Sequence, residues 1–449
     1  MKAYTLLTLL ILFISDSSLA QSGTKNGTFD LSGADQLQIL IDAGMEIKIE
    51  GKDTQTISYT YTFDGNQESY EHYFTNFSPD FEKSGGRAAL RIEFPRQKKQ
   101  SVNFRIKKHE LILEIPRELE LEFQSRYSKV EVSNIARTTT LTNRSGKIFA
   151  HNMGQELRVL NEYGNVRAEN INGNVTINSR SSNIDVKQVR GDLNIDSDYS
   201  KLNISQVSGE SFIKSKSGTV NAFDLKANFT AVGDYTKFEV TNISGDVDID
   251  TKSTKIYIDN VENLVVNGDY TNIHAQNITG EHGVQIDSKS AKINLEKVRG
   301  TANVKGEYLN ISLSDINKDA FIINKSGSVD TKNVQGDIQI DGSYNKINLD
   351  TFKGSNLRIN NRSGSIEVEA MNKLNSIEIE SEYGNVTLDL NTPFKGNLDL
   401  EIRYGSLDHP FTVNGSIVKE SNLVTVEGTA GNETGVLRVK LRNGDLKIK

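Results

Sequence analysis

Five tyrosines recur along the chain with a spacing that could serve ligand binding. They are Tyr163, Tyr199, Tyr235, Tyr270 and Tyr308, and consecutive members are 35 to 38 residues apart. Tyrosine offers rigid contact area at low entropic cost, so a row of such rings could stack sugar rings or hold a peptide. The alternative is that each ring covers the small Ser or Gly beside it and completes the packing of a turn.

The other reactive residue types show no catalytic arrangement. The 6 histidines have neither a metal-ligand nor a triad spacing, and the chain lacks a G-x-S-x-G elbow, a P-loop and a dinucleotide fingerprint. Carboxylates such as Asp246, Asp248 and Asp250 alternate along one predicted strand and would share a solvated face. The sequence therefore predicts no catalytic residue and no enzymatic activity.

Calcium needs a separate argument, because calcium-bound β-rolls also use two strands per 18-residue coil. Their turns carry G-G-x-G-x-D, whose oxygens converge on the ion. Here the turns read Asp-Tyr-Ser-Lys or Lys-Ser-Gly-Thr, and a basic residue occupies every second one. Lys and Arg would repel the cation, so we expect neither a metal nor another cofactor.

A second candidate surface is basic. It comprises Arg96, Lys98, Lys99, Arg105, Lys107 and Lys108. It could touch anionic glycans or lipid headgroups, although an exposed charged hairpin loop is the simpler interpretation. The whole chain has a net charge of -7 with mixed charges, which gives no indication of nucleic-acid binding.

An 18-residue repeat carries the tyrosines. Examples are residues 191–208 (GDLNIDSDYSKLNISQVS) and 245–262 (GDVDIDTKSTKIYIDNVE), and the pattern extends from about residue 121 to 407. Each unit holds two short runs of alternating apolar and polar residues between Gly, Ser, Asn and Asp, which predicts strand, turn, strand, turn. One unit cannot bury its own apolar face, so the units must stack into a solenoid.

Two alternations along the repeat decide the size of one coil. Tyr and Ser alternate after the first strand, as in Ser217, Tyr235 and Ser253, and the preceding residue alternates in charge, as in Lys216 and Asp234. Coils of 36 residues would stack like charges ~4.8 Å apart, which is destabilising. We therefore predict an all-β fold, a parallel β-solenoid of 18-residue two-strand coils, with a β-rich N-terminal cap.

The ends of the chain differ from the repeat, and we divide it into four parts. Residues 1–20 are predicted to be a secretory signal peptide, because a lysine, a short apolar core and small residues precede a cleavage point after Ala20. Residues 21–117 form the N-terminal β-rich cap, 118–410 the β-solenoid repeats, and 411–449 C-terminal strands and a cap. Within the first cap, the helical spacing of Tyr70, Tyr73, Phe74 and Phe77 indicates a short amphipathic helix whose rings are core.

Several short motifs resemble a known family. The turns at residues 216–220 (KSGTV) and 244–247 (SGDV), the lead-in at 113–116 (LEIP) and the closing 444–448 (GDLKI) are similar to those of bacterial cell-envelope β-solenoid domains called the putative adhesin family. The resemblance implies an envelope β-solenoid for which adhesion is proposed. It carries over no catalytic residue.

Together these observations favour a non-enzymatic, exported bacterial envelope protein with an adhesive or structural role. We expect it in the periplasm, at the cell surface or outside the cell, with no transmembrane segment in the mature chain. A glycan, an envelope polymer or a surface protein is the expected partner. The alternative is a carbohydrate-active enzyme, a polysaccharide lyase or hydrolase, on the same scaffold, although an 18-residue coil leaves little room for the loops that build a cleft.

Overall fold

The computed structural model describes residues 20–95, 104–372, 374–432 and 434–449. The chain divides into two compact units, Met1–Lys147 (unit 1) and Ile148–Lys449 (unit 2), and each is described by itself. The predicted signal peptide lies almost wholly outside the described residues, as do Arg96, Lys98 and Lys99 of the basic surface.

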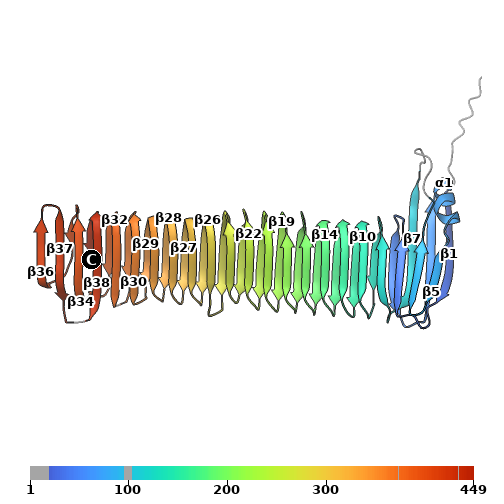
Figure 1. Cartoon of the computed structure of the whole chain (residues 1–449), viewed down its shortest axis with the longest axis horizontal. Coiled ribbons are helices and arrows are strands. Elements are labelled where there is room, and N and C mark those ends of the chain that lie inside the picture. The colour runs from blue at the N-terminus through green and yellow to red at the C-terminus, as the bar shows by residue number, and fades with distance from the viewer. Residues whose placement is uncertain (1–19, 96–103, 373, 433) are drawn as a thin grey trace, which may run out of the picture. The chain divides into compact units, whose positions relative to one another are not determined.

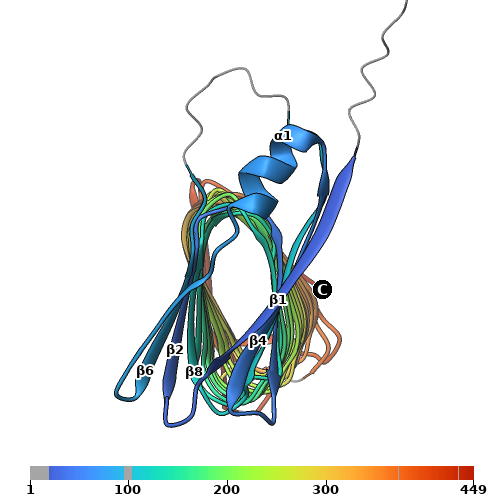
Figure 2. The same cartoon turned by 90° about the vertical axis from the view of Figure 1, so that its right-hand side faces the viewer.

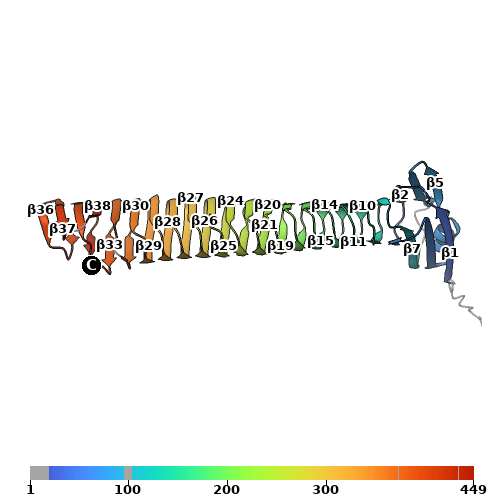
Figure 3. The same ribbon diagram turned by 90° about the horizontal axis from the view of Figure 1, so that it is seen from below.

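Unit 2 is a parallel β-solenoid with two strands in each coil (Figures 1 and 3). Its strands up to the long ones are β11 (Ile148–Met153), β12 (Leu157–Tyr163), β13 (Val166–Ile171), β14 (Val175–Ser181), β15 (Asn183–Val189), β16 (Leu193–Ser197), β17 (Lys201–Val207), β18 (Ser211–Ser215), β19 (Gly218–Leu225), β20 (Phe229–Asp234), β21 (Thr236–Ile243), β22 (Val247–Lys252), β23 (Lys255–Val261), β24 (Leu264–Asp269) and β25 (Thr271–Ile278). Four 15-residue strands follow and run through the turn between the sheets: β26 (Val284–Val298), β27 (Ala302–Ile316), β28 (Ala320–Val334) and β29 (Ile338–Phe352).

The remaining strands of unit 2 close the C-terminal end. They are β30 (Asn356–Ser363), β31 (Ile366–Ala370), β32 (Ser376–Tyr383), β33 (Val386–Leu390), β34 (Gly396–Arg403), β35 (Leu407–Asp408), β36 (Val413–Glu420), β37 (Leu423–Ala430), β38 (Gly435–Asn443) and β39 (Leu446–Ile448).

The register confirms the 18-residue coil. Leu157 of β12 pairs with Val175 of β14, and Val175 pairs with Leu193 of β16, each 18 residues further on. Alternate residues of each strand point inward, so Val175 and Ile177 are buried while the residues beside them are not. Parallel strands with one apolar face must pack on a second sheet, and the second strand of each coil supplies it.

One corner of each coil explains how polar residues hold the turn. The residue before the last one of the second strand has a left-handed backbone in twelve successive coils, with φ between 55° and 58°. Asn tolerates this conformation better than other residues with a Cβ. Where Asn occurs it also joins the coils: Asn242 Nδ2 donates to Asp224 Oδ1 at 3.2 Å, and Asn260 Nδ2 donates to Asn242 Oδ1 at 2.9 Å.

The last coil in space is not the last in sequence. β38 pairs in parallel with β32 on one side and with β34 on the other, and β39 likewise lies between β33 and β35. The chain therefore builds β34 and β35, turns back through the hairpin of β36 and β37, and inserts its final residues one coil earlier (Figure 1).

Unit 1 also consists of two sheets. Its strands are β1 (Gln21–Asp30), β2 (Gln36–Ile41), β3 (Glu46–Lys52), β4 (Thr56–Gly65), β5 (Asp80–Ser84), β6 (Arg87–Ile92), β7 (Ile106–Pro116), β8 (Glu120–Ser125), β9 (Lys129–Ser133) and β10 (Thr139–Ser145). The orders are β5-β6-β2-β8-β10 and β1-β4-β7-β3-β9. Figure 2 shows β2, β6 and β8 in one layer and β1 and β4 in the other. The coil of β2 and β3 lies between neighbours that come 50 or more residues later.

The predicted amphipathic helix is present as α1 (Gln67–Ser69) and the π-helical η1 (Tyr70–Thr75). Its rings pack on β4 and β7: Tyr61 stacks on Phe77 with centroids 3.8 Å apart, and His109 lies 4.7 Å from Tyr73. The aromatic stripe is therefore core, as predicted. The fold class is also confirmed, whereas the four-part division of the chain stays a prediction.

Candidate functional site: a tyrosine row on the solenoid

The five predicted tyrosines all lie at the edge of unit 2 where the two sheets meet. Their neighbours in adjacent coils are serines, as predicted: Tyr163 pairs with Ser181, and Tyr308 lies between Ser290 and Ser326. The side chains are 41% to 67% exposed. Each ring thus keeps a large open surface instead of disappearing into turn packing.

Three rings stand on left-handed backbone, namely Tyr199, Tyr235 and Tyr270 with φ of 50°, 54° and 55°. This conformation costs a residue with a Cβ about 1–2 kcal/mol. The next residue anchors it: Thr236 is fully buried, and its Oγ1 donates to the carbonyls of Asp234 at 3.1 Å and Ser215 at 3.0 Å. Ser200 and Thr271 bond the carbonyl before their tyrosine in the same way, at 2.9 and 3.1 Å.

The row continues beyond the five predicted members. Tyr344 and Tyr383 pair with Ser363 on either side of it and are also exposed. Because β38 lies between β32 and β34, Asn443 stands beside Tyr383, and the exposed Tyr404 follows directly after β34 on the far side. We call these eight residues the tyrosine row: Tyr163, Tyr199, Tyr235, Tyr270, Tyr308, Tyr344, Tyr383 and Tyr404.

A shallow hollow of about 670 Å³ follows the row around Tyr199 and Tyr235. Hydroxyl, amide and amine groups line it beside the rings: Asn165, Ser181, Ser182, Asn183, Ser200, Lys201, Ser217 and Thr219, together with Gly218. These side chains come from consecutive coils, so the hollow runs along the solenoid. Its chemistry suits an extended ligand with many hydrogen-bonding groups and apolar faces.

Alternating charges flank the row, as predicted from the 18-residue coil. Asp234 pairs in register with Lys252, which pairs in turn with Asp269. Near the C-terminal end the contact is direct, with Arg362 Nε 3.1 Å from Glu382 Oε2. Such exposed pairs add little stability singly, but they keep neighbouring coils in one register.

Comparison with known protein families gives one match. The model of the family described as Toastrack DUF4097 matches residues 36–257 and 344–449, which together are well over half of the chain. The chain belongs to the Toastrack DUF4097 family. The first Toastrack segment begins at Gln36, the first residue of β2, and residues 258–343 between the two segments continue the same 18-residue register.

Two solved structures resemble the Toastrack chain at low sequence identity. A putative cell adhesion protein from Clostridium sporogenes is 14% identical with a TM-score of 0.27, covering 53% of this chain and 99% of its own. A putative lipid binding protein from Parabacteroides distasonis is 16% identical with a TM-score of 0.17, covering 75% of this chain and 96% of its own. Comparison with curated proteins found no match.

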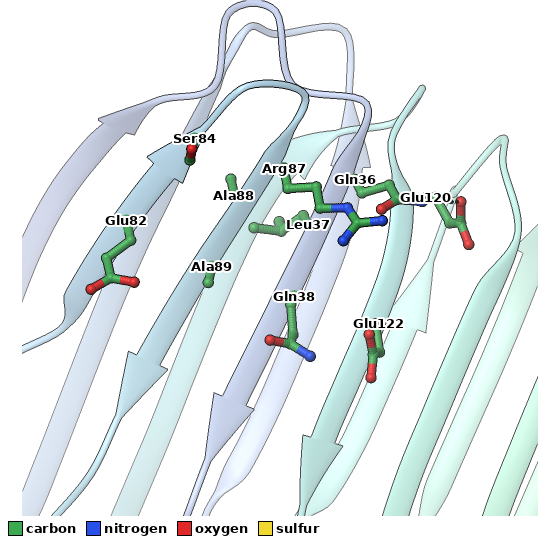
Figure 4. Close-up of a pocket in the computed structure, with 10 residues that line it drawn as sticks. All are labelled: Gln36, Leu37, Gln38, Glu82, Ser84, Arg87, Ala88, Ala89, Glu120 and Glu122. Atoms are coloured by element: carbon green, nitrogen blue, oxygen red, sulfur yellow. Dashed lines mark hydrogen bonds between the residues drawn. The ribbon is translucent and has the colours of Figure 1, made fainter.

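Two further hollows of the Toastrack chain lie elsewhere. One, of about 400 Å³, is on β2, β5, β6 and β8 of unit 1, where Figure 4 shows Arg87 pointing toward the side of Glu120. Gln36 Nε2 donates to Glu120 Oε2 there at 2.9 Å. Glu82 and Glu122 complete a lining of mixed charge on the strands of one sheet.

The other hollow, of about 720 Å³, lies over the inserted strand β38. Its charges balance in part within the hollow, since Arg403 Nε lies 2.6 Å from Glu401 Oε1 and Lys440 stands in register between Glu380 and Glu401. Tyr404, the last ring of the row, is at its rim.

Metal and membrane sites were also considered. Within the described ranges, no group of three or more His, Cys, Asp or Glu side chains is placed to hold a metal ion. None of the helices in that part of the chain has the length and apolar character needed to cross a membrane. Of the basic surface, Arg105, Lys107 and Lys108 are described and exposed, and Lys108 Nζ lies 2.9 Å from Glu110 Oε2.

Proposed function

We propose that this protein is an exported, non-enzymatic component of the bacterial envelope that binds an extended partner along the tyrosine row. The observation that carries the proposal is the row itself: eight exposed rings, alternating with small polar residues, on one edge of a regular solenoid. Tyrosine is enriched among the residues that dominate binding energies. A soluble protein has no packing reason to expose so many rings in line.

The geometry favours many weak contacts over one strong pocket. A single shallow contact with a half-exposed ring contributes little, but contacts made by one ligand along several coils act at high effective concentration. A long polymer gains most from such a surface, and the straight hollow beside Tyr199 and Tyr235 offers it a path.

The lining of this hollow supports binding over catalysis. Hydrolysis of a glycosidic bond requires two carboxyl groups facing each other across the scissile bond. The side chains beside Tyr199 and Tyr235 are instead hydroxyls, amides and a lysine. Export is supported by the predicted cleavage point after Ala20, because β1 begins at the following residue, Gln21.

The test is binding of the chain from Gln21 onward to an array of glycans, envelope polymers and surface proteins. The triple variant Tyr163→Ala/Tyr199→Ala/Tyr235→Ala should lose most of the binding while its β-sheet circular dichroism stays unchanged. Tyr257→Ala is the matched control, since Tyr257 is 38% exposed on β23, away from the row. Undiminished binding by the triple variant, or none by the wild type, would refute the proposal.

A further inference from the structure

We infer that the ligand of the tyrosine row is an extended polysaccharide whose disaccharide repeat matches two coils of the solenoid. The inference rests on the proposed function and adds the chemical class of the ligand. It starts from the spacing of the rings: successive tyrosines are two coils apart, so equivalent positions recur every ~9.6 Å, twice the distance between neighbouring strands. This is close to the length of one disaccharide in an extended β-linked chain.

The alternation of ring and serine fits such a chain as well as the spacing does. Successive sugars in an extended β-1,4-linked polysaccharide are turned over relative to each other, so the same face recurs at every second sugar. A tyrosine in every second coil can stack on each recurring face. The intervening coils present Ser181, Ser217, Ser253, Ser290 and Ser326, which leave room for the turned sugar and offer it a hydroxyl.

An extended peptide fits the period less well. A β-strand advances ~3.3 Å per residue, so its side chains recur on one face every ~6.6 Å, out of step with the rings. A polyproline II helix repeats every ~9.3 Å and is nearer in length. However, it docks into apolar slots between neighbouring aromatic side chains, whereas here a polar serine separates each ring from the next.

The backbone fixes this period before any ligand arrives. Tyr235 and Ser253 have nearly the same left-handed φ, 54° and 53°. The N–H of each donates to the next coil, to Lys252 and Asp269 respectively, and each is followed by a buried threonine. The positions are thus interchangeable in conformation and differ only in the side chain they display. A surface ordered in advance loses little entropy on binding.

This equivalence allows a variant that changes the period but not the number of rings. In Tyr235→Ser/Ser253→Tyr, the spacings from Tyr199 to Tyr270 become three coils and one coil instead of two and two. The single variant Tyr235→Ser, which removes one ring, is the companion. Circular dichroism and thermal unfolding establish that both retain the solenoid.

The probes are β-1,4-linked oligomers of glucose and of N-acetylglucosamine with two, four, six and eight sugars, measured by calorimetry with the chain from Gln21 onward. Coiled α-1,4-linked glucose oligomers of equal length and a polyproline peptide serve as comparisons. We expect affinity for at least one β-linked series to rise with each added disaccharide. The period-changing variant should bind the six-sugar probe about tenfold more weakly, equivalent to ~1.4 kcal/mol, and no better than Tyr235→Ser.

Three results would overturn the inference. One is equal binding by the period-changing variant and the wild type, since the spacing would then be irrelevant. Another is a preference for the α-linked oligomers or the polyproline peptide. The third is the absence of glycan binding while an envelope protein still binds in a tyrosine-dependent way, which would leave the proposed function intact. Loss of tyrosine dependence for every partner would refute both.

Discussion

His109 is a buried histidine whose titration should be visible in the stability of unit 1. Its ring lies among Tyr61, Phe63, Tyr73 and Phe94, and burial there lowers its pKa to about 4. Removing the imidazolium from water is costly unless it is paired, so the folded state holds the neutral ring. The unfolded chain would take up the proton near pH 6.5.

The sign of the pH dependence follows. Between pH 6.5 and about 4 the unfolded state binds more protons than the folded state, so stability is full above pH 6.5 and falls as the pH is lowered. The whole loss is about 3 kcal/mol, as an order of magnitude. Urea unfolding followed by near-ultraviolet circular dichroism of the aromatic rings, between pH 7.5 and 5, should show the decline.

His109→Leu should flatten this decline without abolishing it. His72 lies nearby and its pKa is also lowered by burial, so it acts in the same direction. Glu110 acts mainly at lower pH, because Lys48 and Lys108 hold the pKa of its carboxyl below the usual value. An equally steep profile in His109→Leu would show that His109 does not govern the transition.

At the scale of elements, the inserted strand β38 should hold the end of unit 2 together. Val439 is fully buried and pairs in register with Ile379 on one side and Leu400 on the other. In Val439→Asp an unpaired carboxylate would face this apolar core, at a cost of several kcal/mol. β34 to β37 should become sensitive to protease while the coils before β30 stay resistant, because solenoid coils depend mainly on their neighbours.

Lys440→Gln supplies the control for this prediction. Lys440 is the next residue of β38 and its side chain is exposed on the opposite face, so its substitution should leave the digestion pattern unchanged. Mass spectrometry of the fragments locates the cuts. Resistance of β34 to β37 in Val439→Asp would mean that the hairpin and β34 dock without the inserted strand.

The strands and their stacking could be predicted from the sequence because they follow local rules. Apolar alternation marked the strands, and the charge alternation around Asp234 and Lys252 decided between coils of 18 and 36 residues. The left-handed Asn corner could have been found as well, since Asn242 and Asn260 stand 18 residues apart before an apolar residue.

The insertion of strands at both ends was beyond local rules. Nothing near β38 says that it pairs with β32 and β34, because strand order depends on contacts between segments 39 to 60 residues apart. The sequence held one clue: residues 442–448 (RNGDLKI) repeat the form of 190–195 (RGDLNI) and so carry the pattern of a coil. Tyr404 was missed as a member of the row for the same reason.

At the scale of the whole molecule, the open edge of β36 raises the question of self-association. β36 forms a ladder with β37, and its other edge has no partner among the described strands. Ile417 and Lys419 lie on one face of it, opposite Val426 and Val424. A lysine on an edge strand is a known device against edge-to-edge pairing, because a second sheet would have to bury its charge.

Lys419→Ile should therefore promote association. The variant would present Val413, Ile417 and the new isoleucine on one face of an unpaired strand, and analytical ultracentrifugation should show concentration-dependent dimers or larger species. Glu420→Gln, which removes a charge on the opposite face of the same strand, should behave like the wild type. A Lys419→Ile protein that sediments as the wild type does would show that the edge is protected by other means.

The position of β38 also sets a timetable for synthesis. A ribosome or an export channel delivers the chain from its N-terminus, and most coils of unit 2 can settle as soon as they emerge, since each needs only the coil before it. β34 cannot, because its permanent neighbour is made of the last residues to appear. Until Lys449 is released, some fifty residues must wait beside an unfinished stack. The protein thus completes its fold only once translation has ended, and any chain cut short would be recognisable by its unsealed end.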